Sequence, residues 1–102
     1  MPGAAEVRLD LNNPEFQSQL FNLQKHEQRA VLNGLRKLAR MTWPQVYRDK
    51  GLKWEQIHSR TGPQGRTLYS LRLGKAFRVV AWREEEWLRL LTLHPDHDSA
   101  YH

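Results

Sequence analysis

The C-terminal segment, residues 94–102, concentrates side chains that can transfer protons. It contains three of the five histidines, including His94 and His97, together with Tyr101. An imidazole titrates near neutral pH and can give or take a proton, and a tyrosine can do either or stack on a nucleobase. Two other interpretations stay open: a metal site formed with the neighbouring aspartates, or a frayed terminus without a role. Because the sequence has no second cluster of ligands, we expect no metal.

Arg72 and Arg78 lie on either side of the sequence GKA at positions 74–76, which we interpret as a β-hairpin loop. A two-residue loop would place Leu71 opposite Arg78 and bury a charge against the apolar face of the sheet. A three-residue loop pairs apolar residues on one face and places Arg72 opposite Arg78 on the other. We expect the longer loop, because a slip of one residue turns a whole strand over. The predicted apolar pairs are Leu73 with Phe77, Leu71 with Val79 and Tyr69 with Ala81.

Two guanidinium groups that face each other suggest an anion site. Like charges directly opposite in a sheet repel each other. A bound phosphate would reverse the sign of this interaction, and arginine suits phosphate because its planar group can donate two parallel hydrogen bonds. The alternative is that both side chains simply extend into water. Arg72 and Arg78 are therefore the predicted phosphate-holding pair.

Residues of matching strand parity would share a face with this pair. If a strand over 53–57 lies beside one over 66–73, that face also holds Lys53, Glu55 and Ser70. Glu55 is a candidate acid or base, although Lys53 and Glu55 could equally form an ordinary solvated ion pair. The candidate RNA- or phosphate-binding residues are Lys53, Arg66, Ser70 and Lys75.

The elements that position these residues begin with a strand. Over 6–12, Val7, Leu9 and Leu11 alternate with polar residues, which is typical of a half-buried strand. Asn13 and Pro14 follow as an expected helix N-cap and first helical residue.

Two helices are expected next, with a break at 26–28. Gly34 weakens the second helix and would allow another element to approach it closely. The second helix ends at 42–44, where Thr42 could cap a short further turn through Tyr47. The apolar stripes are Phe16, Leu20 and Leu23 in the first helix and Val31, Leu35, Leu38 and Ala39 in the second.

From Leu52 onward the apolar residues follow period two. We expect strands over 53–57, 66–73, 77–82 and 87–93, with a loop over 61–65. Short connections require antiparallel pairing. The predicted fold class is therefore α+β, with an N-terminal strand and a helical hairpin packed on a small antiparallel sheet, in one domain over 1–102. The four tryptophans are more typical of core or rim packing than of base stacking.

Composition narrows the class of protein. The formal net charge is +5, with most of the excess after Arg40, and a basic surface attracts phosphate or an acidic partner. The absence of cysteine excludes disulfides, thiolate metal sites and a cysteine nucleophile. Residues 1–6 have no apolar segment of the signal-peptide kind, and no run of about eighteen apolar residues exists. We expect a cytoplasmic protein with no membrane partner.

Four short runs in this order resemble the RelE/ParE toxin superfamily, and most closely its RelE- and HigB-type members. They are LKWEQI at 52–57, LYSLRL at 68–73, FRVV at 77–80 and HPDHDSAY at 94–101. The resemblance implies a toxin of a type II toxin–antitoxin system, an endoribonuclease that needs no metal or other cofactor. Such toxins mostly cut mRNA in the ribosomal A site. The 2′-hydroxyl attacks the adjacent phosphate and leaves a cyclic phosphate and a free 5′-hydroxyl.

The resemblance also implies roles and partners. Arg72 and Arg78 would hold the phosphate, Glu55 or Lys53 would occupy the charged strand position, and His94, His97 or Tyr101 would transfer the proton or stack on a base. The implied partners are an antitoxin that covers or distorts the basic site, the ribosome and mRNA. Two other functions stay open: a ParE-like toxin acting on DNA gyrase, and a nucleic-acid-binding module without catalysis.

Overall fold

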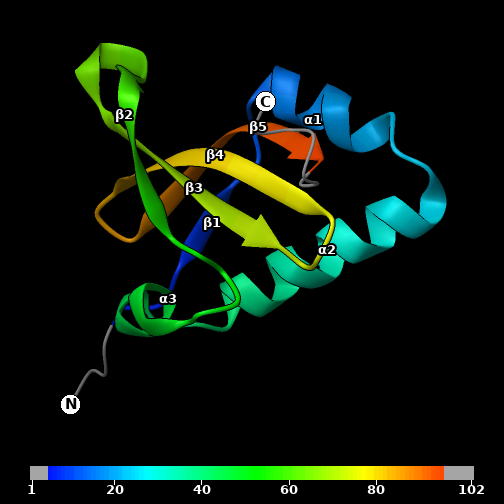
Figure 1. The fold of residues 1–102 in the computed structure, drawn as a ribbon, viewed down its shortest axis with the longest axis horizontal. Coiled ribbons are helices and arrows are strands. Elements are labelled where there is room, and N and C mark those ends of the chain that lie inside the picture. Colours follow the sequence, from blue (N-terminus) through cyan, green and yellow to red (C-terminus); the bar gives the residue numbers. More distant parts are fainter. Residues whose placement is uncertain (1–4, 96–102) are drawn as a thin grey trace.

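The computed structural model describes residues 5–95, which form a five-stranded sheet, three α-helices and a short 3-10 helix (Figure 1). In chain order the elements are β1 (Arg8–Asp10), α1 (Pro14–Phe21), α2 (Lys25–Ala39), α3 (Trp43–Arg48), β2 (Glu55–Thr61), η1 (Pro63–Gly65), β3 (Thr67–Leu73), β4 (Phe77–Glu84) and β5 (Trp87–Pro95). The predicted α+β class and the order of its elements are confirmed.

The sheet has the strand order β1-β5-β4-β3-β2. Its last four strands form an antiparallel meander, as their short connections require. The sheet is mixed rather than purely antiparallel, because β1 joins the edge parallel to β5, with Arg8 opposite Trp87. The long connection that a parallel pair needs runs from β1 through all three helices and strands β2 to β4. The prediction that Leu11 shares the buried side of this strand is wrong: β1 ends at Asp10 and Leu11 is exposed.

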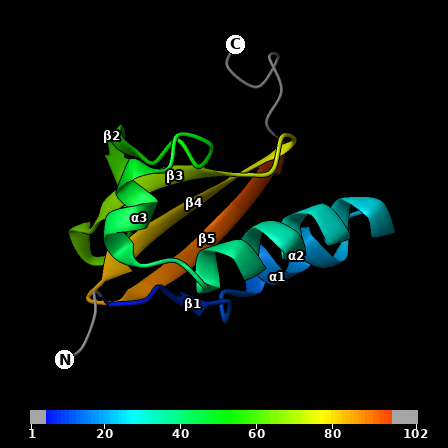
Figure 2. The ribbon, with the colours of Figure 1, turned by 90° about the horizontal axis from the view of Figure 1, so that it is seen from below.

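Helices α1 and α2 pack on one face of the sheet (Figure 2). Asn13 caps α1 as predicted, its side-chain oxygen accepting from the backbone N–H of Glu15 at 2.8 Å. The break between the helices lies at 22–24 rather than at the predicted 26–28. The physical reason is a capping interaction, in which the backbone N–H of Gln24 donates to the Glu27 carboxylate at 2.9 Å and starts α2 there. Thr42 caps α3, also as predicted.

Gly34 lies where α2 packs tightly against β3. A Cβ at this position would lie 3.1 Å from the Cβ of Leu73 in β3. The glycine therefore lets the helix approach the strand, as the sequence suggested. Leu35, Leu38 and Val31 point into the same core and are buried.

Among residues 5–95, no helix is long and apolar enough to cross a membrane. The longest, α2, has 15 residues and a strongly basic surface.

Candidate active site

The β3–β4 hairpin has the predicted register. Leu73 pairs with Phe77, Leu71 with Val79 and Arg72 with Arg78 across a three-residue loop. Gly74 takes a left-handed backbone conformation, with φ 67°, which glycine adopts without strain. Leu71, Leu73 and Val79 are fully buried beneath the helices. The two arginines therefore lie on the opposite face of the sheet. We call this face, which α1 and α2 do not cover (Figure 2), the open face.

A β-bulge in β5 brings His94 to the same face. Val80 pairs with Thr92, but its neighbour Ala81 pairs with Leu90, so Leu91 is an extra residue in β5. Without the bulge, His94 would share the parity of Leu90 and point into the core. With it, His94 pairs with Arg78. Arg72, Arg78 and His94 thus lie side by side on β3, β4 and β5, and we call them the basic row.

Sequence reasoning placed His94 after the last strand and missed the bulge. The adjacent pair Leu90 and Leu91, inside a strand of otherwise alternating residues, is the signal that could have indicated it. The strand continues through His94 to Pro95. His97 and Tyr101 lie outside the described residues, so their proposed roles stay predictions.

Arg78 is held in place from the β2 side of the basic row. Its Nη1 donates to Ser70 Oγ at 2.8 Å and lies 3.8 Å from Glu55 Oε2. Ser70 is buried, the Arg78 side chain is only 18% exposed, and the Glu55 side chain is 63% exposed. Glu55 pairs with Ser70 in the β2–β3 register. The structure therefore brings together three of the predicted site residues, Glu55, Ser70 and Arg78.

Arg72 is anchored differently from its neighbour. Its Nη2 donates to the backbone carbonyl oxygen of Lys75 at 3.2 Å, and its backbone N–H donates to the carbonyl oxygen of Leu52 at 2.7 Å. Lys75 thus takes part through its main chain, while its side chain lies on an exposed loop. The guanidinium of Arg72 is turned toward that loop. The residue is half-buried and pairs with Arg78 in the β3–β4 register.

Two predicted cations lie elsewhere. Lys53 is not in a strand: β2 begins at Glu55, and Lys53 occupies the preceding turn with a left-handed φ of 48°. The chain turns there because Leu52 is buried and bonded to β3 before β2 starts. Arg66 precedes β3 by one residue and lies six residues from Arg72. At about 3.3 Å per residue this is about 20 Å along the strand.

Arg66 belongs to a separate cluster at that far end of the sheet. Its Nη2 bonds to Glu84 Oε2 at 3.2 Å, and its guanidinium lies 4.8 Å from the centre of the Trp82 ring. Arg89 bonds to Glu84 at 2.9 Å and to Asp10 at 3.0 Å. These cations are neutralised by carboxylates, so the structure does not add Arg66 to the phosphate site.

The tryptophans pack as expected for core and rim. Trp43 is 2% exposed, and Trp54 is packed against the core while stacking on Tyr69, with ring centres 4.5 Å apart. Trp82 and Trp87 are half-buried beside Arg89.

The electrostatic surroundings of His94 favour its neutral form. Partial burial and the nearby positive charge of Arg60 lower the pKa of His94 below its ordinary value of 6.5, and Glu15 opposes this shift. The ring Nε2 lies 2.8 Å from Thr92 Oγ1. Because His94 pairs with Arg78 in the β4–β5 register, a neutral imidazole there can accept a proton near a phosphate bound in the basic row. Among residues 5–95, no three His, Cys, Asp or Glu side chains gather as a metal site would require.

Comparison with known proteins identifies the fold. No protein-family model matches the chain, and no curated protein matches its sequence. The structure is similar to a chain in the crystal structure of the archaeal RelE–RelB complex from Pyrococcus horikoshii OT3, with a TM-score of 0.56 and 22% identity. The match covers 91% of this chain and 96% of that chain. The predicted RelE-like fold is thereby confirmed.

Proposed function

We propose that this chain is the toxin of a toxin–antitoxin pair and that it inhibits translation by cutting mRNA on the ribosome. The observation that carries the proposal is the basic row: Arg72, Arg78 and His94 side by side on the open face of a RelE-like fold. Phosphoryl transfer to an internal hydroxyl needs a base, cations on the phosphorane and an acid for the leaving oxygen. The basic row contains two of these three requirements.

Arg78 is the main stabiliser of negative charge in this scheme. Its side chain is largely buried and is already oriented by Ser70 at 2.8 Å. A cation held in place at a partly desolvated site stabilises developing charge better than one that must reorganise in water. Arg72, directly across the hairpin, supplies the second positive charge. A phosphate between them removes the repulsion of the free protein.

His94 accepts the proton of the attacking 2′-hydroxyl. Its lowered pKa keeps the imidazole neutral at physiological pH, as a base requires. The 2′-oxygen forms a bond to phosphorus, and the bond from phosphorus to the 5′-oxygen breaks. The products are a 2′,3′-cyclic phosphate and a 5′-hydroxyl, whose oxygen takes its proton from His97 or Tyr101. Glu55, 3.8 Å from Arg78, is an alternative base or a positioning residue for that arginine.

The partners follow from the same surface. The RelE-like chain to which this one is similar was crystallised in a complex with RelB. We propose a cognate antitoxin here too, with carboxylates that cover the basic row, and a cytoplasmic location where ribosomes and mRNA are available. Net charge of +5 favours approach to ribosomal RNA.

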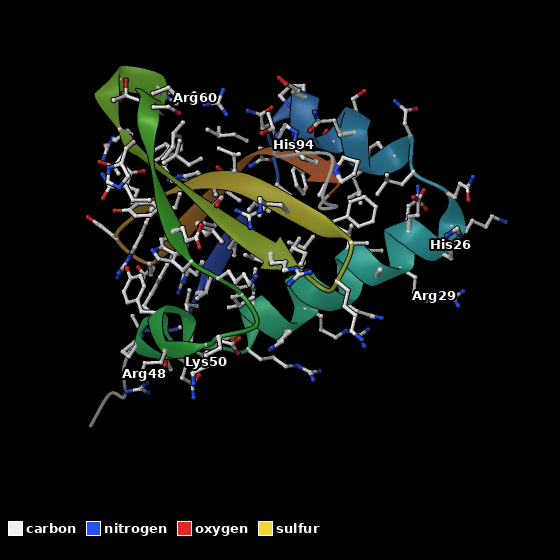
Figure 3. The ribbon with its side chains drawn as sticks, viewed as in Figure 1. His26, Arg29, Arg48, Lys50, Arg60 and His94 are labelled. Atoms are coloured by element: carbon white, nitrogen blue, oxygen red, sulfur yellow. The ribbon has the colours of Figure 1, made fainter. Side chains whose placement is uncertain are left out.

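The experiment is expression in growing bacteria with ribosome-associated mRNA ends mapped by sequencing. The wild type should stop growth and cut mRNA, and Arg72→Ala and Arg78→Ala should each relieve both effects. Arg48→Ala is the matched control, because Arg48 is exposed on α3 and lies well away from His94 (Figure 3). DNA-damage signalling without mRNA cuts would select the gyrase-directed alternative. Salt-dependent RNA binding without any cleavage would select the non-enzymatic one.

A further inference from the structure

A cavity of about 300 Å³ opens beside the basic row. It lies between the first turn of α1, the connection from β2 to β3 and the bulged part of β5. Leu68 and Val80 are buried beneath it, and half-buried Leu91 lines it from the bulge. Glu15 and Arg60, both exposed, lie on its rim. Figure 3 shows Arg60 near the tip of β2, on the same side of the molecule as His94. Polar side chains predominate in the lining, which includes Asn13, Glu15, Arg60, Thr61 and Thr92. Such a lining suits a ligand that offers hydrogen-bonding edges as well as an apolar face.

The cavity adjoins the phosphate site directly. Val80 pairs with Thr92, one step along the strands from the pair of Arg78 with His94. Two residues along a strand span about 7 Å. Thr92 lines the cavity and its hydroxyl is 2.8 Å from the His94 ring. A nucleotide whose 2′-hydroxyl faces His94 can therefore reach this cavity with its base.

Hydrogen bonds and close packing fix the wall formed by the β2–β3 connection. The backbone N–H of Gly62 donates to the Arg66 carbonyl at 2.7 Å, and that of Arg66 donates to the Pro63 carbonyl at 3.1 Å. Gly62 rests on Leu68 so closely that a Cβ there would come within 2.5 Å of Leu68 Cδ2. Leu91 enters the opposite wall only because of the bulge. Backbone contacts on one side and the bulge on the other therefore preform the cavity.

We propose that this cavity binds the base of the nucleotide whose 2′-hydroxyl attacks, and that it prefers guanine. The inference rests on the proposed function, because that function places the ribose at His94. The two rim residues carry the preference. A guanidinium such as Arg60 donates to the paired acceptors O6 and N7 of guanine. A carboxylate such as Glu15 accepts from the N–H groups of its Watson–Crick edge.

The other bases fit the rim less well. Adenine presents an amino donor where guanine has O6, so it opposes the Arg60 guanidinium with a second donor. Pyrimidines lack N7 altogether. The half-buried side chain of Leu91 offers apolar contact to the face of any base, so it contributes affinity without discrimination.

Binding of nucleoside 3′-monophosphates tests the inference without requiring cleavage. We would titrate the purified protein with 3′-GMP, 3′-AMP, 3′-CMP, 3′-UMP and inorganic phosphate, following the methyl resonances of Val80 and Leu91 and the ring of His94 by NMR. We expect 3′-GMP to shift both methyl groups and to bind about tenfold tighter than the other nucleotides, as one good bidentate contact allows. Inorganic phosphate should shift His94 and leave the methyl groups unchanged.

Two exposed-residue variants sharpen the test. Glu15→Gln and Arg60→Ala should bring the four nucleotides to within about threefold of one another while leaving phosphate binding in place. The control Arg48→Ala should keep the wild-type preference. Equal affinities for all four nucleotides in the wild type, or no shift at Val80 and Leu91, would overturn the inference.

The cleavage map separates this inference from the proposed function. If the protein prefers 3′-GMP at the cavity but cuts no mRNA, the base site is supported and the proposed nuclease function is contradicted. If the protein cuts mRNA but the base frequencies at the cut are the same in the wild type, Glu15→Gln and Arg60→Ala, the nuclease function is supported and the base site is contradicted.

Discussion

Replacing Arg78 with alanine tests the chemistry assigned to the basic row. Arg78 is 18% exposed and oriented by Ser70, and in the proposed mechanism it is a preorganised donor to the phosphorane. Loss of one such donor typically lowers the rate by about 10²–10³-fold, or about 3–4 kcal/mol of transition-state stabilisation. Arg78→Lys keeps the charge but loses the planar fork, so we expect an intermediate rate, about tenfold below the wild type. The assay is single-turnover cutting of mRNA in ribosomes stalled with an empty A site.

The same substitution also affects stability, and the two effects must be separated. Arg78→Ala removes a charge-assisted hydrogen bond worth about 1.5–3 kcal/mol. It also relieves the repulsion from Arg72, which costs a few tenths of a kcal/mol. The net loss of about 1–2.5 kcal/mol lowers Tm by about 5–20 °C in a domain of this size. Cleavage is therefore measured at 25 °C, with folding checked by circular dichroism.

Arg89→Ala is the matched control. It breaks the bonds to Asp10 and Glu84, at 3.0 Å and 2.9 Å, and so costs comparable stability at the far end of the same face. We expect Arg89→Ala to cut at nearly the wild-type rate. If Arg78→Ala cuts within threefold of the wild type, or if Arg89→Ala loses as much activity as Arg78→Ala, the basic row is not the catalytic site.

Four further predictions concern titratable groups and helix packing. Arg60→Gln should raise the pKa of His94, measured by NMR titration, because it removes a positive charge that lowers this pKa. Because the pKa of His94 is lower in the folded protein than the ordinary 6.5, the unfolded chain binds the proton more readily, and the folded protein loses stability as pH falls below 6.5. His94→Gln should reduce this loss, measured as the free energy of unfolding in urea at pH values below 6.5. Gly34→Ala should destabilise the protein, since overpacking against β3 costs about 1–3 kcal/mol and outweighs a helix-propensity gain of about 1 kcal/mol; Asn33→Ala, exposed on the same helix, should not. Burial alone would raise the pKa of Asp10, but its hydrogen bonds lower the pKa below 3.8. The ionised Asp10 therefore stabilises the folded protein above pH 3.8, and this stability is lost as pH falls below that value. Asp10→Asn should lower the free energy of unfolding near neutral pH and weaken its fall in acid.

The hairpin register was predictable because the wrong choice buries a charge. Only a three-residue loop keeps Arg78 off the apolar face, and this constraint is local to the sequence around Gly74. The contact of α2 with β3 was also suggested by Gly34, since a glycine inside a helix weakens it unless something gains from the missing side chain. In both cases a single residue, Arg78 or Gly34, made one arrangement of the chain energetically much better than the alternative.

The position of His94 was not predictable from strand parity alone. A bulge shifts parity by one, and its only trace in the sequence is the pair Leu90 and Leu91. Both residues are equally apolar, so no burial penalty distinguishes a bulged strand from a strand that ends early. The turn at Lys53 was missed for a similar reason. The alternation of polar and apolar residues allows an exposed lysine either in a strand or in a turn, although the left-handed turn strains the lysine backbone.

Arg66 was misplaced because parity fixes a face but not a position along the strand. Its neutralising partners come from Glu84 and, through Arg89, from Asp10, which are distant in sequence. The cavity beside the basic row was missed for the same reason, since Glu15 and Arg60 line one cavity only after α1 and β2 are placed around β5.

The most direct test of the proposed function is the chemistry of the cut ends. Purified protein would be added to a translating extract and to the same mRNA without ribosomes, and new ends would be assayed for 5′-hydroxyl and 2′,3′-cyclic phosphate groups. We predict such ends inside ribosome-bound codons with the wild type, none with Arg78→Ala, and few without ribosomes. Intact mRNA in the translating extract, or ends that carry a 5′-phosphate, would contradict the proposal that the basic row cleaves RNA through its 2′-hydroxyl.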